Sequence, residues 1–105
     1  MMWQVTDSGK VEVRLRAEGE EQIKVARENA DRFFANVVGD LATSLGIETM
    51  TDELRYSFNK NRPEVTITWR AKVPVGLVPD VREYMIRLAQ SHDPVRGEIV
   101  EPPDQ

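Results

Sequence analysis

Residues 20 to 45 form the longest stretch in which apolar positions recur at helical spacing. At about 100° per residue, seven apolar side chains share one face: Ile23, Ala26, Ala30, Phe34, Val37, Leu41 and Leu45. Glu20 and Glu21 occupy the first turn, where the helix dipole favours negative charge, and Gly46 follows where a left-handed cap is expected. The pattern predicts an amphipathic helix from Glu20 to Leu45.

This predicted helix is long for a small sheet. It would span about 39 Å, whereas a strand of about seven residues spans only about 23 Å. Either Gly39 lets the helix bend, or its last two turns project and need a partner. Projection would allow a second copy to pack across a two-fold axis, which makes a homodimer one of the partner hypotheses.

Four stretches alternate between apolar and polar residues with the period of two that strands require. They cover residues 2–6, 10–16, 53–58 and 65–73. Residues 7–9 and 59–63 are rich in the residue types that form turns. The last two stretches are therefore predicted to pair as a hairpin, whereas a hairpin of the first two is one of two alternatives.

A second, narrower helical stripe lies near the C-terminus and consists of Val81, Tyr84, Met85 and Leu88. Pro79 suits the start of this helix, because a proline at the first helical position loses no hydrogen bond. Residues 98–100 are expected to form a short edge strand, which Pro102 and Pro103 end. Residues 101–105 are expected to be a disordered tail.

These elements predict one α+β domain over residues 1–100, a two-layer fold with a mostly antiparallel sheet of four or five strands and both helices on one face. Two topologies fit. One is βαββαβ, which resembles the ferredoxin-like plan and uses residues 96–100 as its last strand. The other makes residues 2–16 a hairpin and leaves the tail irregular. The expected core combines Trp3, Val11, Val13, Leu15, Tyr56, Phe58, Ile67 and Trp69 with Ile23, Phe34, Val37 and Leu41.

Composition argues against several kinds of chemistry. The 105 residues include no cysteine, which excludes disulfides, thiolate zinc sites and cysteine nucleophiles. His92, the single histidine, lies beside Asp93 at a helix end, where a cap or exposed role is expected. We therefore expect no enzymatic activity, catalytic residue, metal or cofactor. No run of 18 apolar residues exists, so we expect no membrane partner and a cytoplasmic location.

Charge is segregated along the chain, whose net charge is -4. Residues 18–53 carry nine acids against three bases, and residues 54–73 carry five bases against one acid. The predicted strands are therefore basic and the helices acidic. This distribution concerns partners rather than fold.

The sheet face away from the helices is the candidate binding surface. Its expected residues are Glu12, Arg14, Arg16, Arg55, Ser57, Asn59, Thr66, Thr68, Arg70 and Lys72. Six of them are the candidate binding residues: Arg14, Arg16, Arg55, Thr68, Arg70 and Lys72. Guanidinium groups offer forked donors to carboxylates and phosphates. A solvated face whose charges discourage aggregation is the other interpretation.

The leading hypothesis is a small non-enzymatic module that binds a protein partner through this basic face or through the long helix. The alternative is sequence-independent contact with a nucleic-acid backbone, for which the cations of the face are suited. The expected face has no aromatic side chain on which bases would stack, so base-specific recognition is not expected.

Overall fold

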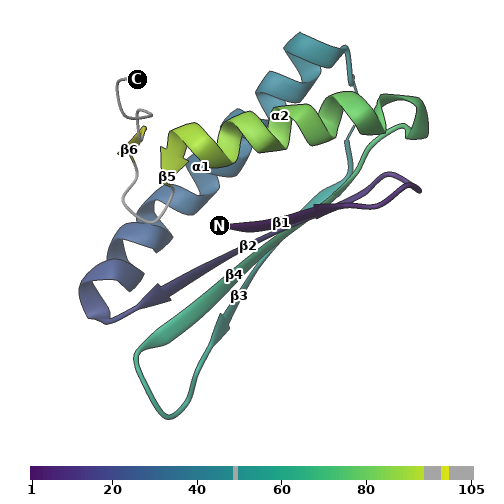
Figure 1. The fold of residues 1–105 in the computed structure, drawn as a ribbon. Coiled ribbons are helices and arrows are strands. Elements are labelled where there is room, and N and C mark those ends of the chain that lie inside the picture. The colour runs from purple at the N-terminus through teal and green to yellow at the C-terminus, as the bar shows by residue number, and fades with distance from the viewer. Residues whose placement is uncertain (49, 94–97, 100–105) are drawn as a thin grey trace.

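The computed structural model describes the backbone of residues 1–48, 50–93 and 98–99, and the side chains of residues 1–48 and 50–90. In chain order the elements are β1 (Met2–Val5), β2 (Lys10–Glu18), α1 (Glu20–Leu45), β3 (Asp52–Phe58), β4 (Glu64–Lys72), the 3-10 turn η1 (Val75–Leu77), α2 (Val78–Ser91), β5 (His92–Asp93) and β6 (Glu98–Ile99) (Figure 1). The long helix has the predicted bounds, and the four main strands lie where the alternation placed them. The expected tail, residues 101–105, lies outside the described residues.

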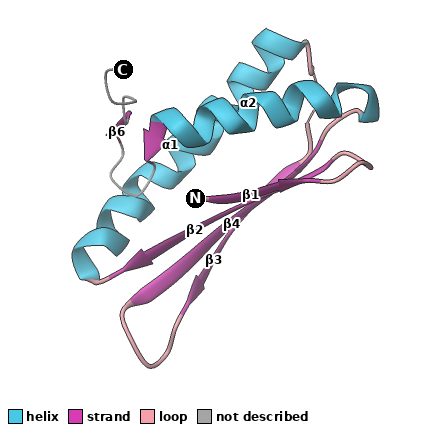
Figure 2. Ribbon diagram, viewed as in Figure 1, coloured by secondary structure: helices cyan, strands magenta, loops and turns pink. Residues whose placement is uncertain are grey.

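The main sheet has the strand order β1-β2-β4-β3, and every neighbouring pair is antiparallel. Strands β2 and β3 are therefore parallel to each other with β4 between them, and α1 makes the crossover. Both helices lie on one face of this sheet (Figure 2). The predicted α+β class and two-layer arrangement are confirmed.

The structure contains the hairpin of the second topology, because β1 pairs with β2 and occupies the edge beside it. The unit formed by β2, α1, β3 and β4 also belongs to the ferredoxin-like plan. The C-terminal strand β6 pairs with β5 in a separate two-stranded sheet. The ferredoxin-like order is thus compatible with the central unit but is not confirmed, and three residues of its proposed last strand (96, 97 and 100) are outside the described chain.

The turn between β1 and β2 depends on Gly9. Its φ is 91°, and its N–H donates to the carbonyl of Thr6 at 3.0 Å. The Gly9 carbonyl also accepts the N–H of Val73 at 2.8 Å. A Cβ at this position would lie 2.2 Å from the Val73 carbonyl oxygen, so both conformation and space require glycine.

The core lies between the sheet and the two helices. Trp69 is fully buried and stacks on Phe34, with ring centroids 5.2 Å apart and planes 11° from parallel. The Trp69 indole Nε1–H donates to Asp52 Oδ2 at 3.1 Å. Phe58 departs from the predicted core, because its side chain is 53% exposed at the end of the edge strand, with the Arg27 guanidinium 5.4 Å from its ring centroid.

The C-terminal half of α1 contacts α2 of the same chain. The Tyr84 hydroxyl donates to Asp40 Oδ2 at 3.0 Å and joins α2 to the C-terminal half of α1. Val81 and Met85 are fully buried, as is Leu41 of α1. The predicted stripe is therefore largely used within one chain, and α1 is assigned as one helix throughout.

Candidate functional site: the open face of the sheet

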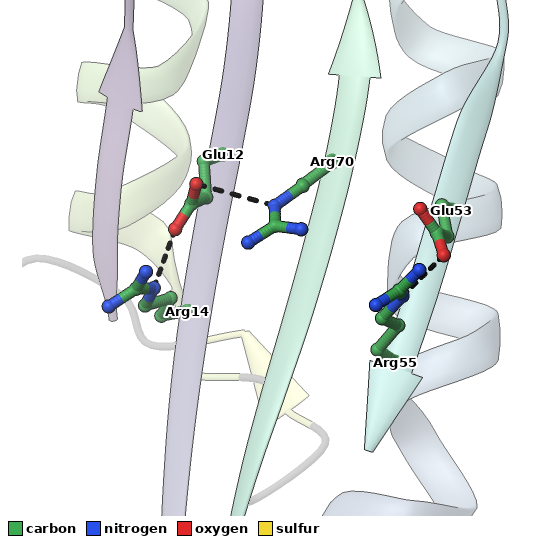
Figure 3. Close-up of polar contacts among 5 residues, drawn as sticks. All are labelled: Glu12, Arg14, Glu53, Arg55 and Arg70. Atoms are coloured by element: carbon green, nitrogen blue, oxygen red, sulfur yellow. Dashed lines mark hydrogen bonds and ion pairs between the residues drawn. The ribbon is translucent and has the colours of Figure 1, made fainter. Parts of the chain in front are cut away.

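The open face is the side of the main sheet opposite α1 and α2, and its residues form rows across the strands. One row runs Gln4, Glu12, Arg70, Glu53, and the next contains Arg14, Thr68 and Arg55. Figure 3 shows the charged side chains of both rows on this face. All six predicted binding residues occur on it, and the register brings them into adjacent rows.

The arginines at the centre of the face contact carboxylates. Glu12 accepts from Arg14 Nε at 2.6 Å and from Arg70 Nε at 3.4 Å. Glu53 forms an ion pair with Arg55 on the same strand (Figure 3). These side chains are all partly or largely exposed, so each pair contributes only about 0–1 kcal/mol.

Arg16 has two carboxylate neighbours at the far end of the face. It lies 2.8 Å from Glu64 and 3.1 Å from Glu18. The hydrogen bond and negative charge of Glu64, with a smaller effect of Glu18, raise the pKa of Arg16 above its ordinary value. All four predicted arginines therefore carry an acidic partner.

The structure places more acids on this face than the sequence analysis did. The face expected from the sequence included only Glu12, whereas the register adds Glu18, Glu53 and Glu64. The open face then carries six bases and four acids among the described strands. Glu53 already began the 53–58 stretch with the parity of Arg55, and extending the stretches 10–16 and 65–73 to the true strand ends would have added Glu18 and Glu64. The face is a mixed-charge network with a small basic excess, rather than a uniformly basic platform.

Two lysines at one end of the face differ from the arginines. Lys10 and Lys72 are directly opposite each other on β2 and β4, and both are exposed. Within the described chain neither side chain has a hydrogen bond or ion pair. Like charges that face each other across strands are destabilising. Lys72 is one of the six predicted binding residues, whereas Lys10 is not, although Lys10 begins the alternation of β2.

The two lysines line a shallow hollow of about 730 Å3, together with Gln4, Thr6, Thr51 and Arg70. Its acidic lining residues are already engaged: Asp52 accepts from the Trp69 indole, while Glu12 and Glu53 contact arginines. An oxyanion entering the hollow would thus meet two unpaired ammonium groups. The arrangement is suited to binding a carboxylate or a phosphate.

Other chemistry has less support in the described residues. They contain no group of three or more His, Asp or Glu residues arranged to hold a metal. His92 lies in β5, and its side chain is outside the described part. The pKa values of Tyr56 and Tyr84 are raised mainly by burial and, to a smaller extent, by contact of each hydroxyl with an aspartate. Both hydroxyls lie on the helix side of the sheet, away from the hollow.

The described helices include none with the length and apolar character needed to cross a membrane.

The open face offers a ligand two different environments, its lysine end and its arginine network. Comparison of the chain with protein-family models, curated proteins and solved structures found no match.

Proposed function

We propose that this protein is a non-enzymatic binding module that receives an acidic segment of a protein partner on its open sheet face. The observation that carries the proposal is the unpaired lysine pair, Lys10 and Lys72, at the hollow. A partner carboxylate between the two ammonium groups would remove their mutual repulsion and accept charge-assisted hydrogen bonds from both. Binding would therefore be strongest at this end of the face.

A mixed-charge face favours a protein partner over a nucleic acid. A phosphate backbone would have to approach Glu12, Glu53 and Glu64, which already neutralise the neighbouring arginines. A protein segment can offer carboxylates to the lysines and donors to these glutamates. The hydroxyl of Thr68, between Arg14 and Arg55 in its row, adds a neutral hydrogen-bonding position.

The proposal can be tested by titrating the 15N-labelled protein with a hexaglutamate peptide at low salt. We expect chemical-shift changes at Lys10, Lys72 and Thr51, and loss of binding in the double variant Lys10→Glu/Lys72→Glu. The matched control is Lys24→Glu/Lys60→Glu, which makes the same change in net charge at exposed positions outside the hollow.

Equal weakening in both double variants would show only a general charge effect and would contradict the proposal, as would no binding to the wild-type chain. A parallel titration with a single-stranded thymidine dodecamer addresses the alternative. Tighter binding of the oligonucleotide, lost on Arg14→Glu/Arg55→Glu, would replace the protein partner with a nucleic-acid backbone.

A further inference from the structure

The outer edge of β3 has unpaired backbone groups. Among the described strands β3 pairs only with β4 and forms the end of the sheet. Thr51 and Asn59, which flank the strand, both use their backbone groups toward β4. Because bonding alternates along an antiparallel strand, the even-numbered residues from Asp52 to Phe58 direct their N–H and C=O groups outward.

The backbone of this edge presents no obstacle to strand addition, although the strand carries the charged residues Asp52, Glu53 and Arg55. Its seven residues contain no proline, and their pairing with β4 has no bulge. The edge also presents apolar surface on its helix-facing side: Leu54 and Tyr56 are half-buried, and Phe58 is exposed. A regular, partly apolar edge is a template for another strand.

The charges of β3 indicate which strand fits. Antiparallel pairing of two β3 edges about a two-fold axis at Leu54 would place Glu53 opposite the partner's Arg55, and Arg55 opposite the partner's Glu53. An axis at Arg55 would oppose two arginines, and an axis at Tyr56 would leave Glu53 opposite an asparagine. Side chains at such non-hydrogen-bonded positions approach closely, so charge favours the axis at Leu54.

We infer that this protein forms a two-fold dimer by antiparallel pairing of β3 with the β3 of a second copy, centred on Leu54. The even-numbered residues supply the backbone hydrogen bonds, with Asp52 opposite the partner's Tyr56. The exposed Phe58 then lies opposite the partner's Met50. The existing Glu53–Arg55 contact within each strand combines with the two new pairs to give four charges that alternate in sign.

The dimer joins two four-stranded sheets into one and leaves the open faces of both copies accessible on the same side. It does not require the proposed acidic partner, because the two lysines lie on β2 and β4, although the hollow also reaches β3 through Asp52 and Glu53. It also differs from the helix-mediated homodimer of the sequence analysis, because the apolar stripe of α1 is already largely buried within one chain.

A charge exchange tests this register, with solution mass measured by light scattering over a concentration series. The wild-type chain should reach twice its 12.0 kDa mass. Glu53→Arg and Arg55→Glu should each weaken dimerisation at least tenfold, because each opposes like charges twice across the axis. The double variant Glu53→Arg/Arg55→Glu should restore it, since opposite charges face each other again.

Both substituted side chains are exposed, and circular dichroism verifies that each variant folds. Protection of the Leu54 and Tyr56 amides from hydrogen exchange should rise with concentration in parallel with the mass. A chain that stays monomeric at the highest concentration would overturn the inference. A dimer that tolerates Glu53→Arg would also overturn it, because the alternative registers place no cation opposite residue 53.

Discussion

The contact between Tyr84 and Asp40 gives a sharp test of how the two helices are held together. Substitution Tyr84→Phe removes the hydroxyl that donates to Asp40 Oδ2 and leaves the ring in place. Asp40 is exposed, so water can solvate its carboxylate after the change. The loss of stability should therefore reflect the hydrogen bond alone and not a stranded buried charge.

The geometry sets the expected size of this loss. Hydrogen bonds to charged groups contribute about 1.5–3 kcal/mol, but the 3.0 Å separation is longer than is typical for a hydroxyl donor, and the acceptor is exposed. We expect Tyr84→Phe to lower the free energy of unfolding by about 1 kcal/mol. Tyr56→Phe is the matched control, because its contact with Asp31 is longer, at 3.3 Å, and should cost no more than about 0.5 kcal/mol.

Urea unfolding followed by tryptophan fluorescence would measure both variants, since the core residue Trp69 reports on the packed state. A double-mutant cycle with Asp40→Ala should recover a coupling of about 1 kcal/mol between the two positions. Additive effects of Tyr84→Phe and Asp40→Ala would refute the reasoning. Equal losses for the two tyrosine variants would refute the ranking by geometry.

Two further predictions concern pH and backbone conformation. Burial and the Asp40 contact raise the pKa of Tyr84 above its ordinary value of 10.0, so its contribution to stability is complete below pH 10 and is lost as pH rises toward the folded-state pKa. Between pH 9 and pH 11 the wild-type chain should lose more unfolding free energy than Tyr84→Phe, and equal losses would contradict this. Gly9→Ala should lower the free energy of unfolding by more than about 2 kcal/mol, because the new side chain meets both a positive φ and a steric clash. Gly39→Ala should instead raise it by up to about 1 kcal/mol, because Gly39 lies inside α1 with open space around it. Urea unfolding that gave both changes the same sign would be inconsistent with the structure.

Local patterns in the sequence were sufficient to predict α1 and its ends. The stripe from Ile23 to Leu45 repeats with the helical period, and Gly46 adopts the left-handed conformation expected of a cap, with φ of 69°. The hairpin of β3 and β4 was predicted in the same way, because turn residues separate two alternating stretches, whereas the hairpin of β1 and β2 was one of two topologies that the sequence allowed. These features depend on residues that are close in the sequence, so their physical causes are visible without a fold.

The candidate site was only partly predictable. Alternation assigned Arg14, Arg55 and Arg70 to one face, but it did not show which carboxylates would neutralise them. Glu12 and Arg70 are 58 positions apart, and only the pairing of β2 with β4 makes them neighbours. The same pairing sets Lys10 opposite Lys72, and this is why the proposed function centres on the lysine end rather than on all six predicted binding residues.

The sequence by itself determined the two helices, the four strands of the main sheet and the apolar side of each of these strands, because those properties follow from local periodicity. Tertiary structure decided the strand order, the contact between α1 and α2 through Tyr84 and Asp40, and the exposure of Phe58 at an edge. It also decided which charges are paired. These outcomes depend on contacts between distant segments, whose energies come from cross-strand register and from packing of the whole domain.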